Sequence, residues 1–292
     1  MDQRIIDLYD RFTHGRMNRR DFLDRLTEVA GSAAAAAALL PLLKNDPARA
    51  AIVAPDDPRL AIDTASYEVQ GVKISGQLVR LKAKGKRPAV LVIHENRGLN
   101  AHIQDVARRV ALEGFLVFAI DVLSPWGGTP SDDEKGREMF AANVKPEEAA
   151  PRVAAAIPFL AKHAESTGKV GAVGFCWGGG MVNSIAMLSP DLNAGVAYNG
   201  QVPPLDNVAQ IKAPLLLHYA GLDTNVNGRI PEYEAALKNA GKKYTLYMYP
   251  DVNHAFNNDT GAARYNKAAA DLAWGRTIAF FKDNVGAPPK SS

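Results

Sequence analysis

Short apolar runs alternate with helical patterns along most of the chain, and this alternation limits the possible folds more than any other feature. The runs are apolar throughout and lack the polar–apolar alternation of half-exposed strands. Such continuous runs are typical of strands buried on both faces. Helical segments separate them, so the sequence predicts βαβ units and an α/β fold with a mainly parallel twisted sheet and helices on both faces. The apolar runs lie at residues 88–94, 115–121, 169–175, 194–200 and 213–221.

The segment from Tyr67 to Leu81 has two alternating stretches around Gly71, and we expect an antiparallel pair at a sheet edge there. We predict one catalytic α/β domain over residues 67–292, preceded by a Pro- and Asp-rich linker over residues 51–66. The chain is 47% hydrophobic and 22% charged, values that suit a large buried core. A net charge of +3 without a basic stripe gives no indication of nucleic-acid binding.

Residues 1–50 have a different composition. Arg19-Arg20 precede an Ala- and Leu-rich stretch at about 29–43, and the small-residue triplet Ala48-Arg49-Ala50 follows. This order is typical of a signal peptide, here of the twin-arginine type, and predicts export to the periplasm. The stretch is shorter than the ~20 apolar residues of a membrane span, so no stable span is expected. The alternative is a helical hairpin that packs on the domain of a cytoplasmic protein, which Glu28 and the helix-like segment before the arginines favour.

The single cysteine lies in a glycine-rich turn between a predicted strand and a predicted helix. Gly174-Phe175-Cys176-Trp177-Gly178 fits the nucleophile elbow of hydrolases with sulfur in place of oxygen. The helix that begins at Trp177 directs its free N–H groups at the turn, which lowers a thiol pKa and lets the Trp177 N–H hold an oxyanion. The alternative is a buried structural cysteine.

An acid and a histidine follow the elbow in the chain order of α/β hydrolases. Asp223 comes after the strand at 213–221, and His254 comes after the last predicted strand, which ends at Pro250. In this arrangement His254 takes the thiol proton of Cys176, and Asp223 fixes the tautomer of the imidazole. The rival His218 lies inside an apolar strand, and the rival Asp251 lies in the same loop as His254.

His94-Glu95 ends the first parallel strand. A metalloprotease motif needs a second histidine at position 98, which is glycine, so no metal site is expected. This loop supplies the second oxyanion donor in the hydrolase fold, which points to the Asn96 N–H. Glu95 is either a solvated loop acid or a carboxylate beside Cys176 that governs the protonation of the thiol.

These motifs resemble the dienelactone hydrolases (carboxymethylenebutenolidases), which have the α/β-hydrolase fold. The resemblance rests on "VIHENRGLN", "GFCWGG", "LLLHYAGLDTNV" and "VNHAFNND" and covers residues 67–285. It implies Cys176 as nucleophile, Asp223 as acid, His254 as base and Glu95 as the carboxylate that interacts with the resting thiol. It also implies hydrolysis of a small ester or lactone through a thioester acyl-enzyme, without a metal or organic cofactor.

The well-studied family members bind the carboxylate of their substrate with arginines. In this chain the matching regions "DVLSPWGG" and "HAFNND" contain no arginine. Arg97 and Arg264 are candidates to substitute, although Arg264 also fits a surface charge at a helix start. We expect an apolar substrate pocket built from aromatic side chains, each of which could equally belong to the core: Trp126, Trp177, Tyr198 and Phe256. A broad carboxylesterase or thioesterase and a non-catalytic binding protein of this fold are the alternatives.

Overall fold

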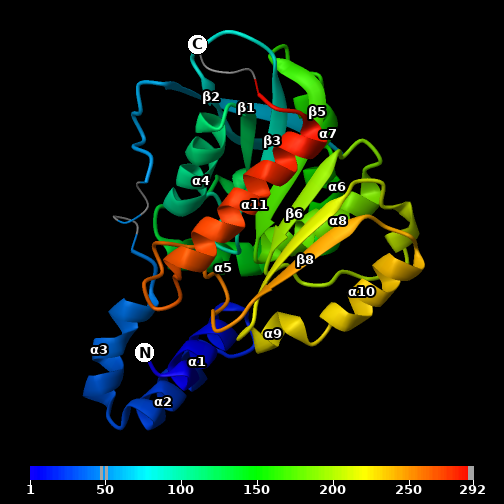
Figure 1. Cartoon of the computed structure of the whole chain (residues 1–292). Helices are drawn as coiled ribbons and strands as arrows, with labels where there is room; N and C mark the ends of the chain where they lie inside the picture. The colour runs from blue at the N-terminus through cyan, green and yellow to red at the C-terminus, as the bar shows by residue number, and fades with distance from the viewer. Residues whose placement is uncertain (47–48, 50–51, 289–292) are drawn as a thin grey trace.

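The computed structural model describes residues 1–46, 49 and 52–288 and centres on one eight-stranded sheet (Figure 1). The strand order is β1-β2-β4-β3-β5-β6-β7-β8; β2 runs antiparallel to β1 and β4, and the other neighbours are parallel. The predicted α/β-hydrolase class is confirmed. The strands are β1 (Leu60–Val69), β2 (Val72–Leu81), β3 (Arg87–Ile93), β4 (Leu116–Asp121), β5 (Ser166–Phe175), β6 (Ala194–Tyr198), β7 (Leu215–Ala220) and β8 (Tyr244–Tyr249).

The predicted antiparallel pair is present, but β1 begins at Leu60, inside the segment expected to be a linker. β1 is an edge strand, and most of its side chains are exposed or half-buried. An edge strand therefore tolerates the polar sequence "LAIDTAS", which lacks the clear apolar alternation on which a strand prediction depends.

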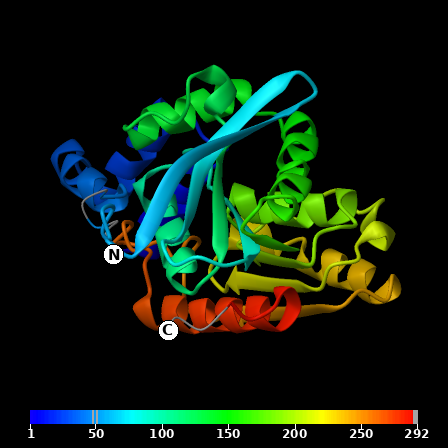
Figure 2. The same ribbon diagram turned by 90° about the horizontal axis from the view of Figure 1, so that it is seen from above.

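Two hydrophobic cores lie on opposite faces of the sheet, and Figure 2 shows helices on both sides of it. α4 and α11 cover one face, while α6, α7, α8 and α10 cover the other. Parallel strands between two such layers have no solvent-exposed face, which explains the unbroken apolar runs in the sequence. The helices are α4 (Ala101–Leu112), α5 (Asp133–Asn143), α6 (Pro146–Ala154), α7 (Ala156–Ala161), α8 (Trp177–Leu188), α9 (Thr224–Asn227), α10 (Ile230–Asn239) and α11 (Lys267–Val285), with short 3₁₀ turns at Ser124–Trp126 and Val208–Gln210.

The first 43 residues form three helices with a small core of their own: α1 (Gln3–Thr13), α2 (Arg19–Ala30) and α3 (Ala33–Leu43). The rings of Phe12 and Phe22 stack with centroids 4.7 Å apart and join α1 to α2. Gly31 adopts a left-handed conformation (φ 81°) and lets the chain turn between α2 and α3. In Figure 1 these helices, drawn in blue, lie at the end of the sheet where α5 and α9 begin.

The three helices pack on the domain, and this packing tests neither of the two predicted locations. Export stays a prediction, and Ala48 and Ala50 of the predicted cleavage triplet lie outside the described residues. Within the part of the chain that the structure describes, no one helix has the length and apolar character of a membrane span. α2 and α3 reach that length and character only as a pair, which is bent by 112°.

Candidate active site

Cys176 occupies a sharp, strained turn between β5 and α8. Its backbone angles are φ 54° and ψ −113°, in a region that residues other than glycine rarely adopt. The flanking glycines are required by close backbone packing. A Cβ on Gly174 would lie 2.0 Å from the Gly178 carbonyl oxygen, and a Cβ on Gly178 would lie 2.3 Å from that of Ile93. The elbow predicted from the sequence is present.

Asp223 and His254 meet at the same end of the sheet, in the loops that follow β7 and β8. The His254 Nδ1–H donates to Asp223 Oδ2 at 2.5 Å, and both side chains are buried. The other carboxylate oxygen, Oδ1, accepts the backbone N–H groups of Asn225 and Val226, each at 3.2 Å, and caps α9. The carboxylate is therefore held from two sides in one orientation toward the imidazole.

His14, which follows the last residue of α1, completes this cluster. Its Nε2 lies 3.4 Å from Cys176 Sγ and 3.3 Å from His254 Nε2. Its Nδ1 lies 2.6 Å from the Asp10 carbonyl oxygen, which fixes the ring. The two Nε2 atoms and the sulfur all lie within 4.8 Å of one another. Sequence analysis missed His14, because it sits far outside the domain in which the elbow, acid and base occur.

The electrostatics of the cluster favour a thiolate. Burial alone would raise the pKa of the Cys176 thiol, but the positive charges of His254 and His14 outweigh it and lower the pKa to about 6. Burial likewise opposes a charge on His254, yet Asp223 and Cys176 raise the pKa of its imidazole well above the ordinary value. The site therefore stabilises a thiolate–imidazolium pair near neutral pH.

A cavity of about 220 Å³ opens beside the sulfur. The N–H of Trp177 faces no carbonyl within its helix, because Trp177 is the first residue of α8. Asn96, the second predicted oxyanion donor, also lines this cavity. The lining residues come from the N-terminal segment, the β3 loop, α5, the elbow and the β6 loop: Thr13, His14, Gly15, Asn96, Arg137, Phe140, Ala141, Cys176, Trp177 and Gln201.

Comparison with known proteins shows which family the chain resembles. The sequence model of the dienelactone hydrolase family matches residues 74–285, and a second model, described as YqhI-like, matches residues 1–31. Proteins named "Putative carboxymethylenebutenolidase" are similar to the chain: that of Saccharolobus solfataricus is 31% identical over 74% of this chain and 96% of its own length. That of Salmonella typhi is 30% identical over 89% and 98%.

The chain belongs to the dienelactone hydrolase family. Its fold agrees with that assignment. The crystal structure of the "Putative Dienelactone Hydrolase" of Klebsiella pneumoniae matches it with a TM-score of 0.66 and 27% identity, over 76% of this chain and 98% of the other. The dienelactone hydrolase model does not cover α1 and α2, which hold His14 at the site, whereas the YqhI-like model covers both helices.

Glu95, the acid of the family loop, is buried and not solvated. Its Oε2 accepts a hydrogen bond from Asn258 at 3.2 Å. Burial would raise the pKa of Glu95, but His102 and Arg97 act against it, and the pKa is lowered. Among the described residues His14 hydrogen-bonds the thiol, a contact that the resemblance had led us to expect of Glu95.

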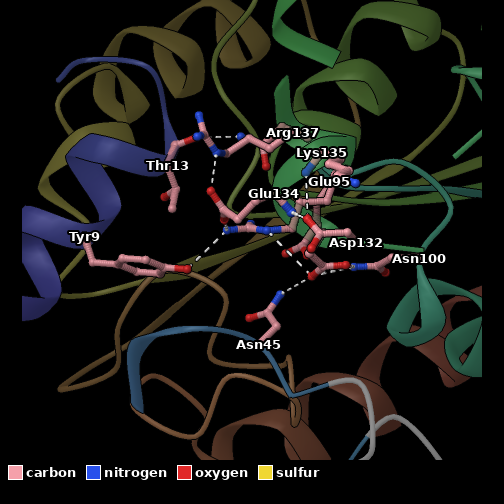
Figure 3. Close-up of polar contacts among 12 residues, drawn as sticks. Tyr9, Thr13, Asn45, Glu95, Asn100, Asp132, Glu134, Lys135 and Arg137 are labelled. Atoms are coloured by element: carbon pink, nitrogen blue, oxygen red, sulfur yellow. Dashed lines mark hydrogen bonds and ion pairs between the residues drawn. The ribbon is translucent and has the colours of Figure 1, made fainter. Parts of the chain in front are cut away.

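Arg97 contacts the N-terminal segment instead of the cavity. Its buried guanidinium reaches the Tyr9 hydroxyl at 3.4 Å and forms ion pairs with Asp133 at 3.7 Å and Glu134 at 3.8 Å. Figure 3 shows Tyr9 of α1 pointing toward this acidic start of α5. The charge of Arg97 is paired with two carboxylates of α5, so the structure gives no support to the predicted role of Arg97 in substrate binding.

Arg264 is also buried, contrary to the surface position considered for it. Its Nη1 donates to Asp10 Oδ1 at 2.9 Å, and its guanidinium lies 5.3 Å from the centroid of the Tyr9 ring. Further bonds tie the segment to the catalytic loops: Gln3 to Asn253 (2.5 Å), Arg16 to Asn225 (2.9 Å) and the Asn96 side chain to the Thr13 carbonyl (2.7 Å). α1 is thereby held against the candidate active site.

Three of the four aromatics expected in the substrate pocket lie elsewhere. Tyr198 is buried, bonds Thr277 Oγ1 at 2.7 Å and packs on Phe175, and Phe256 is fully buried against Tyr249. Trp126 lines a separate cavity next to β2 and α6. Of the four, only Trp177 lines the cavity beside the sulfur, because it directly follows Cys176 at the start of α8.

The rival groups are correctly excluded. The buried His218 contacts the Tyr249 hydroxyl at 2.9 Å and Thr277 at 3.2 Å, and burial lowers the pKa of its imidazole to about 3. Asp251 is exposed. His94, in the β3 loop, is a buried ring that accepts the Val122 N–H at 3.2 Å.

Proposed function

We propose that the protein is a cysteine-dependent hydrolase of small carboxylic esters or lactones. Cys176 is the nucleophile, His254 the base and Asp223 the acid that orients His254. The observation that carries this proposal is the convergence of three loops, after β5, β7 and β8, on one buried cluster with a thiolate-stabilising field. Thiol, imidazole and carboxylate in this order are what thiol acyl transfer requires.

The reaction begins with transfer of the thiol proton to His254 Nε2. The thiolate attacks the carbonyl carbon and forms a C–S bond, and the carbonyl oxygen becomes an oxyanion. Collapse of this intermediate breaks the ester C–O bond, and the leaving alkoxide takes the proton from His254. A water molecule, deprotonated by His254, then attacks the thioester, and expulsion of the thiolate releases the acid and restores the resting enzyme.

The N–H groups of Trp177 and Asn96 are the proposed oxyanion donors. Both residues line the cavity beside the sulfur. Loss of one such donor typically costs about 3 kcal/mol of transition-state stabilisation. The N-terminal end of α8 adds its positive dipole end at the same place.

The size of the cavity and the names of the relatives support a small substrate. About 220 Å³ is less than the roughly 300–1,000 Å³ of pockets that take drug-sized ligands. A relative from Bradyrhizobium, 28% identical over 76% of the chain, is named "Probable 2-oxo-3-(5-oxofuran-2-ylidene)propanoate lactonase". A lactone is a cyclic ester, so one thiol mechanism serves both substrate classes.

Steady-state hydrolysis of p-nitrophenyl acetate and of a simple five-membered lactone tests the proposal. We expect Cys176→Ala to lower kcat/KM by three orders of magnitude or more, as removal of a nucleophile does, with an unchanged circular dichroism spectrum. Unchanged turnover in this variant refutes the mechanism. Faster cleavage of acyl thioesters than of either substrate would redefine the substrate class as that of a thioesterase.

A further inference from the structure

The sulfur of Cys176 and the two imidazole nitrogens lie close enough together to be ligands of one metal ion. Cys176 Sγ and His14 Nε2 lie 3.4 Å apart, and the Nε2 atoms of His14 and His254 lie 3.3 Å apart. Zn–S and Zn–N bonds of about 2.3 and 2.0–2.1 Å at tetrahedral angles give edges of about 3.5 Å (S to N) and about 3.3 Å (N to N). Two of the three separations match these edges, and the third, from Cys176 Sγ to His254 Nε2, is within 4.8 Å, so closing that third edge brings all three atoms onto one ion.

Both imidazoles direct lone pairs at the common centre. His14 Nδ1 faces the Asp10 carbonyl oxygen and His254 Nδ1 faces an Asp223 oxygen, and neither acceptor can donate a proton. In the neutral form of each ring the proton therefore lies on Nδ1, and Nε2 presents its lone pair. Two such nitrogens at 3.3 Å repel unless a proton or a cation lies between them.

The contacts behind the two histidines are those of metal ligands. A metal-bound histidine almost always donates its second N–H to a carboxylate or a backbone carbonyl, which orients the ring. His254 has the carboxylate of Asp223 at 2.5 Å, and His14 has the carbonyl of Asp10 at 2.6 Å. The ring planes of the two histidines are nearly perpendicular, at 87°.

The charge and the neighbouring space also fit a divalent cation. A Cys176 thiolate and the Asp223 carboxylate supply two negative charges, and binding of the cation releases to solvent the proton that the thiol and imidazole share. The cavity beside Cys176 leaves room for a water molecule as the fourth ligand. One thiolate and two imidazoles form a soft ligand set that suits Zn²⁺ and disfavours Mg²⁺ and Ca²⁺.

We propose that the full-length chain binds one Zn²⁺ ion through His14 Nε2, Cys176 Sγ and His254 Nε2, and that this ion reversibly blocks the hydrolase. The inhibition, but not the binding site, rests on the proposed function. The ion occupies the sulfur lone pair that attacks the carbonyl and the nitrogen that takes the proton. The N-terminal segment thereby makes the activity of the enzyme responsive to zinc, because it supplies His14 as the third ligand.

Cobalt titration of the chelator-treated full-length protein tests the site without any substrate. We expect one equivalent of Co²⁺ to produce the near-ultraviolet charge-transfer absorption of a thiolate–cobalt bond, and Zn²⁺ to abolish it by displacement. His14→Gln should weaken Zn²⁺ binding by more than about 100-fold, since loss of an outer-shell partner alone costs 10–100-fold. His163→Gln, a change at a histidine between α7 and β5, should bind like the wild type.

No band at stoichiometric Co²⁺, or the same affinity in His14→Gln, overturns the site. If His14→Gln does not fold, alkylation of the wild type decides: Zn²⁺ must protect Cys176 from iodoacetamide, and undiminished alkylation refutes the site. If the protein shows the cobalt band but its metal-free form does not hydrolyse esters, only the proposed hydrolase activity is refuted. If the metal-free wild type hydrolyses esters and one equivalent of Zn²⁺ does not lower this rate, the proposed inhibition is refuted.

Discussion

The Nε2 atoms of His14 and His254 lie 3.3 Å apart although 240 positions separate the two residues in the sequence. This contact joins the N-terminal helices to the loop after the last strand. It gives the thiol two histidine neighbours where the family pattern provides for one. The N-terminal segment is therefore part of the candidate active site. We expect the reactivity of Cys176 to depend on both His14 and His254.

Replacement of His14 should raise the pKa of the thiol. The thiolate is the reactive form, so alkylation speeds up as pH rises through the thiol pKa, about 6 in the wild type. His14→Ala removes one of the two positive neighbours, so the midpoint of the rate–pH curve should move to higher pH. Iodoacetamide kinetics on chelator-treated protein measure the midpoint, with His163→Ala as the control. A midpoint unchanged in His14→Ala would show that His14 does not act on the thiol.

Asp223→Asn should lower kcat/KM by about 10⁴-fold, because the amide no longer favours the Nδ1–H tautomer or the charged imidazole. The helix cap should survive, since the Asn side-chain oxygen can still accept the two N–H groups of α9. Hydrolysis rates and the thermal midpoint separate the two roles. A small loss of rate, comparable to that of Asp251→Asn in the same protein, would contradict the assignment of Asp223.

Gly178→Ala should destabilise the protein by several kcal/mol or displace the elbow. The new methyl group would lie 2.3 Å from the Ile93 carbonyl oxygen and 2.6 Å from that of His94, and backbone atoms cannot yield as a flexible side chain can. Gly275→Ala in α11 is the matched control, since nothing lies within 4 Å of its Cβ position and alanine favours a helix. Urea unfolding of both variants measures the difference, and equal stabilities would contradict the tight packing of α8 on β3.

Asp10→Asn should loosen α1. It leaves the buried Arg264 without its carboxylate, and breaking a buried ion pair by removing one partner costs about 3–5 kcal/mol. We expect faster hydrogen exchange over residues 3–13, while the central strands stay protected. Arg229→Ala, which breaks an exposed pair with Glu232, should change neither region. Unaltered exchange in Asp10→Asn would mean that this ion pair does not hold the helix.

The catalytic domain was largely predictable because its signals are local. Buried strands appear in the sequence as apolar runs. Residues just after parallel strands lie at one end of the sheet, which predicted that Cys176, Asp223 and His254 lie close together. Tyr198 was misassigned because it lies in a strand and its hydroxyl finds a partner inside the core. Arg97 was misassigned because its acidic partners come from α5, a contact without a sequence signal.

His14 was missed for a different reason. It lies in a segment whose composition is typical of an export signal, and its partners are 162 and 240 positions away. The amphipathic pattern of "IIDLYDRFTHG" favoured a packed helix but not the surface against which it packs. Removal of residues 1–50 by the predicted export pathway would also remove His14, so the mass of the protein isolated from its native host decides whether the described site exists in the cell.

Trapping of the acyl group tests the mechanism most directly. Metal-free protein mixed with p-nitrophenyl acetate and quenched in acid within milliseconds should carry one acetyl group on the peptide that contains Cys176. The label should disappear on the time scale of turnover in the wild type and fail to form in Cys176→Ala. An acetyl group on another residue at a turnover-competent rate, or turnover with no label on Cys176 at any quench time, would contradict nucleophilic catalysis by this thiol.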